Sequence, residues 1–304
     1  MRITHLAFAA LTALTLGVTA ASAQDHAAAA GAEAEAAGGH HLLEPAGGWD
    51  HDGFTGFYDQ NALQRGFKVY REICAACHSL KLLSFRNLGD KGGPFYDAAF
   101  PNPADNPVVK QIAREYPIGG IDPETGDPLD CAADPKACEG KPSDHFPSPY
   151  ANDAAARAGN GGALPPDFSV ITKARHGEAG YIYSLMLGYH EPPQGLTVSA
   201  TQHYNVYFAG DTSAAWAGDP RAKPPGGFLA MPEPLKQDGM VTYDDNTPST
   251  KAQMAKDVAV FLQWAGDPKM ETRKQMGIAV LGYLLVLALF AFLSYKAIWR
   301  KVEH

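Results

Sequence analysis

The stretch Arg65-Gly-Phe-Lys-Val-Tyr-Arg-Glu-Ile-Cys-Ala-Ala-Cys-His-Ser79 contains the most specific pattern in the chain, a helical repeat that leads directly into Cys-x-x-Cys-His. Leu63, Phe67 and Tyr70 are spaced by four and three residues. They therefore share one face of a helix that we predict over residues 61–73. The cysteine motif then continues from the end of this helix.

Two thiols and an imidazole are brought together by the spacing of this motif. Cysteines at positions i and i+3 lie on one side of a helical turn, and a histidine at i+4 projects over the same turn. Such thiols can add to the two vinyl groups along one side of a haem, and Cys-x-x-Cys-His is a known haem attachment motif. The single motif predicts one covalently bound haem c, attached at Cys74 and Cys77, with His78 as an iron ligand.

Two other kinds of site use similar cysteine pairs. A structural zinc site needs two further ligands at matching spacing, and Cys131 and Cys138 are separated by six residues, outside the usual gap. A redox dithiol of the thioredoxin type needs a βαβ context, which the sequence does not show. Both alternatives are therefore disfavoured. Cys131 and Cys138 either form a disulfide, in an oxidising compartment, or remain two free thiols.

The composition divides the chain into five segments. Residues 1–23 combine Arg2, a short apolar stretch and the ending Ala21-Ser22-Ala23, as in a secretory signal peptide. Residues 24–48 are rich in Ala and Gly and predict a flexible leader. Residues 49–270 have a globular composition, 271–296 form a predicted transmembrane anchor, and 297–304 form a cytoplasmic tail. The formal charge of −8 excludes nucleic acid as an expected partner.

The predicted anchor rests on residues 277–295, which are free of charge and rich in Leu, Ala, Val and Phe. At a rise of ~1.5 Å per residue this run is close to the thickness of the hydrocarbon layer. Basic residues flank it almost equally, so the signal peptide sets the orientation. We expect a single span in a bacterial inner membrane, with the globular domain on the periplasmic side.

Further helices are predicted over residues 180–187 and 251–265, the second capped by Thr247, Ser249 or Thr250. Residues 89–170 and 209–227 are rich in Gly and Pro and predict long loops. No run of alternating residues predicts strands. The expected fold class is therefore mostly α with long loops.

The second axial ligand of the iron is open on sequence alone, since a low-spin electron carrier uses either Met or His. Met186 and Met254 lie in helical patterns and are expected in the core. Met231 lies in Leu229-Ala-Met-Pro-Glu-Pro234, where prolines stiffen a loop, and is modestly favoured over Met240. The remaining candidates are Met270, His145, His176, His190 and His203.

Several longer motifs occur in the order found in one known family. They are Ala155-Ala-Arg-Ala-Gly-Asn-Gly-Gly-Ala-Leu-Pro-Pro-Asp-Phe-Ser169, Lys173-Ala-Arg-His-Gly177, Ala230-Met-Pro-Glu-Pro-Leu235, Tyr243-Asp-Asp-Asn-Thr-Pro248 and Ala255-Lys-Asp-Val258. With the haem motif and the C-terminal run they cover most of residues 58–300. The chain therefore resembles cytochrome c1, the haem subunit of the cytochrome bc1 complex (ubiquinol–cytochrome c reductase).

The resemblance implies a class I cytochrome c-like haem domain over residues 49–270, whose first and last helices cross near the haem. Gly66 would allow the first helix to approach the 261–264 region of the last. Met231 matches the sixth ligand of the family. Arg175 matches an arginine that pairs with a haem propionate, and Tyr181 falls where a propionate-contacting tyrosine is expected.

The resemblance also implies a wall of the haem pocket on the His78 side, formed by Asn160 and the segment with Pro165 and Pro166. One proline carbonyl would accept the Nδ1 proton of His78 and orient the ring. Residues 209–227 look like an insertion relative to shorter members of the family.

By the same resemblance, the function is electron transfer without bond chemistry. The electron would arrive from the Rieske iron–sulfur protein and leave to a mobile c-type cytochrome, within a dimeric complex that contains cytochrome b. Glu233, Asp238, Asp244 and Asp245 would offer an acidic surface to a basic partner. The alternatives are an anchored cytochrome c domain that serves a terminal oxidase, and an open-haem enzyme.

Overall fold

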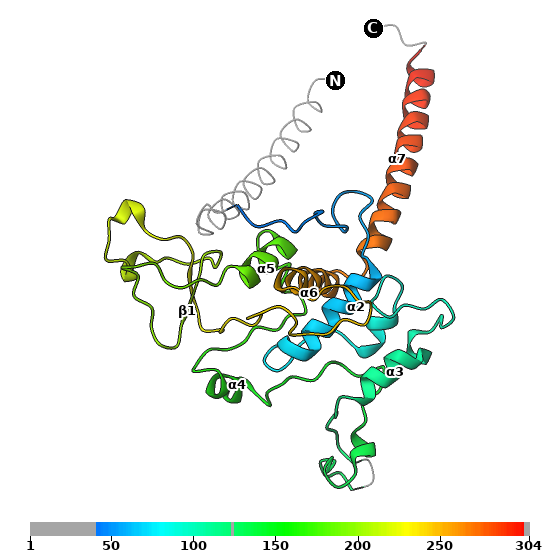
Figure 1. The fold of residues 1–304 in the computed structure, drawn as a ribbon. Helices are drawn as coiled ribbons and strands as arrows, with labels where there is room; N and C mark the ends of the chain where they lie inside the picture. Colours follow the sequence, from blue (N-terminus) through cyan, green and yellow to red (C-terminus); the bar gives the residue numbers. More distant parts are fainter. Residues whose placement is uncertain (1–40, 123–124, 301–304) are drawn as a thin grey trace, which may run out of the picture.

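The computed structural model describes residues 41–122 and 125–300 and shows a mostly helical fold with one small sheet (Figure 1). The predicted signal peptide, most of the leader and the last four residues lie outside this part of the chain. The main elements, in chain order, are α2 (Gln60–Val69), α3 (Pro107–Arg114), α4 (Asp153–Gly159), α5 (Glu178–Leu187), β1 (His203–Asn205), β2 (Gly227–Leu229), α6 (Lys251–Gly266) and α7 (Met270–Trp299). Short 3₁₀ turns cover Phe85–Gly89, Pro103–Asp105, Pro135–Cys138, Ser213–Ala215 and Pro220–Ala222.

The three soluble helices predicted from periodicity are present, each within two residues of the expected bounds at its start. Asp59 caps α2 by accepting hydrogen bonds from the backbone N–H groups of residues 61 and 62. Thr250 is the side chain that caps α6, with Gln253 N–H as donor. Asn106 and Asn152 cap α3 and α4, two short helices inside the region predicted as loop. Both helices are at most eight residues long, too short for a clear helical repeat in the sequence.

Helices α2 and α6 cross at the centre of the domain (Figure 1). A Cβ atom on Gly66 would lie 2.1 Å from the carbonyl oxygen of Asp257 and 2.6 Å from Cβ of Phe261, so only glycine fits this crossing. Aromatic rings fill the space around it, with Phe67 and Tyr70 of α2 each 5.7 Å from Phe261 between ring centroids. The close helix approach expected at Gly66 is confirmed.

A buried ion pair ties the same two helices together. Asp257 is fully buried and accepts two hydrogen bonds from the Arg65 guanidinium, at 2.9 and 3.1 Å. The Gln253 amide donates a third, at 3.0 Å. Pairing with carboxylates raises the pKa of Arg65 against the opposing effect of burial, so the side chain stays charged. The crossing is therefore fixed by both shape and charge.

The small sheet was not predicted. Strands β1 and β2 pair antiparallel, with Tyr204 opposite Phe228. Their connection, residues 206–226, takes in nearly all of the predicted 209–227 loop and is closed by a hydrogen bond from Thr212 Oγ1 to Pro224 O. Asn205 joins β1 to the end of α5 by donating to Leu185 O at 2.8 Å. The strands are only three residues long, too short for an alternating pattern to reveal them.

Residues 41–48 differ from the flexible leader predicted over 24–48. Leu42 and Leu43 pack against the hydrophobic core, and Leu43 N–H donates to Ser184 Oγ of α5 at 2.8 Å. Two adjacent leucines supply enough apolar surface to hold this end of the leader. The packed part of the domain therefore begins before residue 49.

Helix α7 is 30 residues long and leaves the domain as a single rod (Figure 1). It starts one residue before the predicted anchor and ends three residues beyond it. Its apolar side chains are exposed, and among the described residues it is the one helix long and apolar enough to cross a membrane. Because the apolar surface of α7 is not buried against the domain, the helix needs another apolar environment to cover it.

Candidate haem-binding site

The Cys-x-x-Cys-His motif follows a local change in helix geometry. After α2 the chain forms a single π-helical turn, Tyr70–Cys74, in which Ala75 N–H bonds to Tyr70 O at 2.8 Å. The N–H groups of Cys77 and His78 then both donate to Cys74 O, at 3.1 and 2.9 Å. Such π-bulges are frequent at functional sites because they re-aim side chains. Here both thiols and the imidazole emerge from one tight turn.

The ring of His78 is held on one side and buried. Its Nδ1 lies 2.8 Å from the carbonyl oxygen of Pro166, and its ring stacks on Phe168 with centroids 3.9 Å apart. A carbonyl oxygen can only accept, so Nδ1 carries the proton and the lone pair lies on Nε2. Burial lowers the pKa of His78, opposed by the bond to Pro166 and by the Asp167 charge. The neutral ring with a free Nε2 is the form that binds a metal.

Asp167 fastens the segment that orients His78. Its carboxylate accepts hydrogen bonds from Ser79 Oγ at 2.7 Å and Lys81 N–H at 2.9 Å, just beyond the motif. Ser79 O in turn accepts from Phe168 N–H at 2.8 Å. Burial raises the pKa of Asp167, but the donors around it outweigh burial and hold that pKa below its usual value. The carboxylate therefore stays ionised and keeps Pro166 against the imidazole.

The cysteine chemistry fits covalent haem attachment better than the alternatives. Cys74 and Cys77 are free thiols, whereas Cys131 and Cys138 form a disulfide. Burial raises the pKa of the Cys74 thiol to about 12, the opposite of the lowered pKa that a redox dithiol needs. No group of three or more His, Cys, Asp or Glu side chains that could hold a metal ion occurs in the described ranges 41–122 and 125–300. The donor set at the motif is two thiols and one free imidazole nitrogen, which matches a haem attached by thioethers.

The methionines predicted as candidate ligands have different surroundings. Met254, Met270 and Met186 are at most 7% exposed and lie in the core. The sulfur of Met240 accepts a hydrogen bond from Lys236 N–H at 3.2 Å. Met231 is half-buried at the edge of the core, two residues beyond β2. Met231 is the methionine that remains a candidate for the second iron ligand. Exposed histidines such as His176 and His190 also remain candidates.

The Met231 loop is held by its backbone. The Tyr189 hydroxyl donates to Met231 O at 3.2 Å, and the β1–β2 pair ends immediately before the loop. Tyr189 lies two residues beyond α5, and Val206 N–H donates to Gly188 O at 3.0 Å. The small sheet therefore connects the end of α5 to the Met231 loop through backbone contacts.

Two further predicted residues lie together. Arg175 is exposed, donates to Ala174 O at 2.8 Å and interacts with the hydroxyl of Tyr181, which is buried. Burial raises the pKa of Tyr181, so it remains a neutral donor. A guanidinium and a neighbouring phenol hydroxyl can both donate hydrogen bonds to one carboxylate. Asn160 is placed differently: it ends α4 and donates to Ala156 O at 2.7 Å, a local structural bond.

Comparison with known proteins identifies the family. The Cytochrome C1 family model matches residues 49–302. The chain belongs to the cytochrome c1 family. It is 40% identical over 273 residues to cytochrome c1, heme protein, of Saccharomyces cerevisiae mitochondria, covering 90% of this chain and 77% of the yeast protein. It is 39% identical over 265 residues to the Arabidopsis thaliana mitochondrial cytochrome c1 1, covering 87% and 75%. It is 38% identical over 274 residues to cytochrome b/c1 of Bradyrhizobium diazoefficiens, where the match covers 84% of this chain and only 35% of the relative.

All the residues of the cytochrome c1-like motifs lie inside the matched range. The structure adds residues that the sequence did not single out for the site, namely Asp167, Phe168 and Tyr189. The first two belong to the Pro-Pro-Asp-Phe-Ser stretch, where an Asp two residues before a Ser is a recognisable turn signal. No sequence pattern marks Tyr189, because its contact with Met231 O depends on the turn after α5.

The four acidic residues expected to form a partner surface are engaged within the chain. Asp244 pairs with Lys68 at 2.9 Å and Asp245 with Arg65 at 2.6 Å. Glu233 pairs with Lys251, and Asp238 accepts from the backbone N–H of the same lysine. Their charge is therefore partly neutralised by basic residues of α2 and α6.

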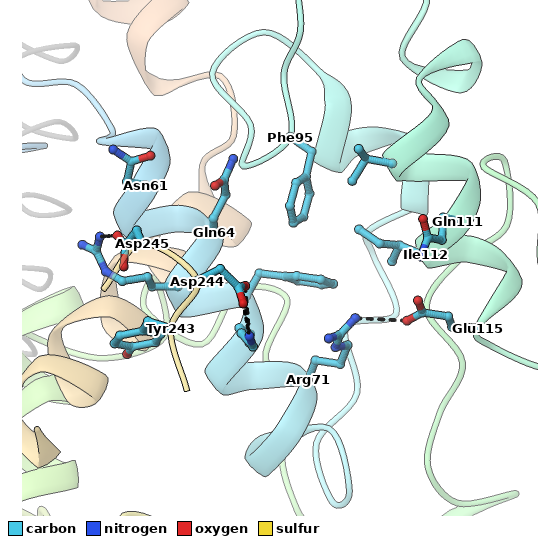
Figure 2. A pocket seen from close by; sticks show the side chains of 14 residues that line it. Asn61, Gln64, Arg71, Phe95, Gln111, Ile112, Glu115, Tyr243, Asp244 and Asp245 are labelled. Carbon is cyan, nitrogen blue, oxygen red and sulfur yellow. Dashed lines mark hydrogen bonds and ion pairs between the residues drawn. The ribbon is translucent and has the colours of Figure 1, made fainter. Parts of the chain in front are cut away.

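A cleft of about 410 Å³ runs along α2. Asp244 and Asp245 border it (Figure 2). Arg71, in the π-helical turn after α2, lines the same cleft and pairs with Glu115 at 3.0 Å. Since each cation of the cleft faces a carboxylate, the cleft carries little net charge and is distinct from the turn that holds His78.

Proposed function

We propose that this chain is a membrane-anchored, monohaem c-type cytochrome that transfers electrons within a cytochrome bc1 complex. The haem c is attached through thioethers at Cys74 and Cys77. The proposal rests mainly on the turn that presents two free thiols beside an imidazole whose Nδ1 is hydrogen-bonded to the carbonyl oxygen of Pro166. Membership of the cytochrome c1 family supports the same function.

The haem, when bound, supplies a one-electron couple at iron. The protein orients His78 through Pro166 and Asp167, which would leave Nε2 free to hold the haem iron. Met231 would also hold the iron, from its stiffened loop, and its thioether would raise the reduction potential. Arg175 and Tyr181 would bind the propionates, and Asn160, Pro165 and the exposed Pro166 would line the haem site near His78. Held in this way, the haem would carry electrons, and the chain would do no bond chemistry of its own.

The proposed partners follow from the family. Relatives are named cytochrome b/c1 and cytochrome b-c1 complex catalytic subunit. We propose that this chain binds cytochrome b, accepts an electron from the Rieske iron–sulfur protein and passes it to a mobile c-type cytochrome, in a dimeric complex. Helix α7 would cross the bacterial inner membrane once, with the haem domain in the periplasm after removal of residues 1–23.

The ligand assignment is tested by Met231→Leu with Met240→Leu as the matched control, since the Met240 sulfur is bonded within the chain. We expect Met231→Leu to remove the low-spin methionine-ligated spectrum of the ferric protein and to allow added cyanide to bind quickly. Met240→Leu should retain the parent spectrum. An unchanged spectrum in Met231→Leu would contradict the assignment, and fast cyanide binding by the parent protein would favour an open-haem enzyme.

The assignment to a bc1 complex is tested by gentle detergent extraction of the membrane, purification through a tag on this chain and identification of the subunits recovered. Recovery of cytochrome b and the Rieske protein supports the proposal. Recovery of terminal oxidase subunits in their place would indicate the alternative role of an anchored cytochrome c domain.

A further inference from the structure

Two large aromatic side chains are exposed on one short loop, residues 50–57. Phe54 is 60% exposed and Phe57 is 55% exposed. The loop is closed at its base by Phe57 N–H, which donates to Asp50 O at 2.9 Å. Gly56 lies so close to the opposite strand of the loop that a Cβ atom would be 2.1 Å from Asp52 O. The loop is therefore compact, and the exposure of its aromatic rings is a feature of its shape.

The 50–57 loop is fastened to the first turns of α7. Lys274 Nζ donates to His51 O at 2.7 Å, and Glu271 Oε1 accepts from Tyr58 N–H at 2.8 Å. His51 itself is buried. In Figure 1 the blue loop that precedes α2 passes beside the start of α7. The 50–57 loop therefore lies beside the first turns of α7.

The position of this contact along α7 can be compared with the start of the helix's apolar run. The charge-free stretch begins after Lys274 and is continuous from Gly277 onward. Three residues of helix correspond to a rise of about 4.5 Å. The polar layer of a bilayer is about 5–8 Å thick on each side of its hydrocarbon core. With α7 in a membrane, the contact between Lys274 and His51 falls in the headgroup layer.

We propose that the 50–57 loop is a second membrane contact, with Phe54 and Phe57 inserted at the boundary between lipid headgroups and acyl chains. The inference rests on the proposed membrane span of α7, whose exposed apolar residues begin at Met276, two residues after Lys274. Asp50 and Asp52 are exposed on the same loop, so attraction to anionic lipid does not drive the contact. The surface that the loop contacts is a bilayer of zwitterionic lipid. Two contacts in place of one would limit the tilt of the haem domain on the membrane.

Single spin labels on the full-length haem-loaded chain, reconstituted in phosphatidylcholine vesicles, test the proposal. Cys131 and Cys138 form a disulfide, and in the haem-loaded chain Cys74 and Cys77 would be consumed by the proposed thioethers, so the parent chain should take up no label. Labels are attached in Phe54→Cys and Phe57→Cys. The matched control is Ile121→Cys, a 62% exposed apolar residue on the loop beyond α3. Leu284→Cys reports on the span itself. Oxygen collects in the bilayer and a nickel chelate remains in water, so the ratio of their collisions with each label measures depth.

We expect the ratio of oxygen to nickel accessibility at positions 54 and 57 to be several-fold above that at 121 and below that at 284. Addition of anionic lipid should leave the ratios unchanged. A ratio at 54 and 57 equal to that at 121 would overturn the inference while a high ratio at 284 keeps the span. Labels at 54 and 57 shielded from both reagents would also overturn it, since a second copy of the chain would then cover the loop. A low ratio at 284 would show that the proposed anchor itself fails.

Discussion

Substitution of Gly66 by alanine tests the central packing of the domain. The new Cβ would lie 2.1 Å from Asp257 O and 2.6 Å from Phe261 Cβ, where ordinary contact is at least about 3.4 Å. Helices α2 and α6 would have to separate by about 1 Å, and overpacking of this kind costs about 3 kcal/mol. Alanine regains about 1 kcal/mol of helix propensity. The net loss is about 2 kcal/mol, or a fall in Tm of about 4–8 °C for a domain of this size.

Gly180→Ala is the matched control, because Gly180 is also helical but a Cβ there would meet only Leu42 Cδ1, at 4.0 Å. This variant should gain up to about 1 kcal/mol from helix propensity. Both proteins are measured in the same detergent by thermal unfolding, followed by far-UV circular dichroism and by the haem absorption band. Equal stability of the two variants would refute the close helix crossing as the reason for glycine at position 66.

Three further predictions concern groups that fix the rest of the domain. Asp257→Asn should lower the free energy of unfolding by about 2 kcal/mol, since it removes the buried one of the two carboxylates that pair with Arg65 and leaves only Asp245. The control Asp244→Asn removes a carboxylate that is 89% exposed and should change the free energy of unfolding by less than about 1 kcal/mol. Equal effects of the two substitutions in denaturant titrations would show that burial of the pair is unimportant. Asp167 has a pKa below its ordinary value in the folded state, so its carboxylate stabilises the fold above about pH 4 and this contribution is lost as the pH falls through the folded-state pKa. Asp167→Asn should therefore cost about 1 kcal/mol at pH 7, after allowance for solvent screening, and progressively less below about pH 4; a deficit that is independent of pH would reject the role of the charge. Replacement of both Cys131 and Cys138 by serine should remove about 2 kcal/mol of local stability and speed hydrogen exchange in residues 118–140, with the haem spectrum unchanged. Altered haem ligation in that variant would indicate an unexpected connection between the loop and the site.

The sequence predicted the parts of the fold that depend on local patterns. The helix before Cys74, the helix capped at Thr250 and the apolar C-terminal helix each have a repeat or a composition that identifies them. The hydrogen bond from His78 to a proline carbonyl was expected from the family motif and is present at Pro166. These features are encoded within about twenty residues of chain, which is the range over which periodicity and motifs are informative.

The missed features depend on contacts between distant segments. The β1–β2 pair consists of two three-residue strands separated by a long connection, so neither strand has a periodic signal. Leu43 is ordered by Ser184, which is 141 residues away in the chain. The acidic residues 244 and 245 read as a free surface in the sequence, whereas α2 supplies Lys68 and Arg65 as their partners. Such pairings become visible only when the fold is known.

Covalent attachment of the haem is tested most directly by acid–acetone extraction of the purified full-length chain, followed by pyridine haemochrome analysis of both fractions and intact mass measurement of the polypeptide. The thiols of Cys74 and Cys77 lead us to expect one haem per chain, all of it retained by the protein with the spectrum of two thioether links. Pigment released into the acetone, or a polypeptide mass without haem, would contradict the account.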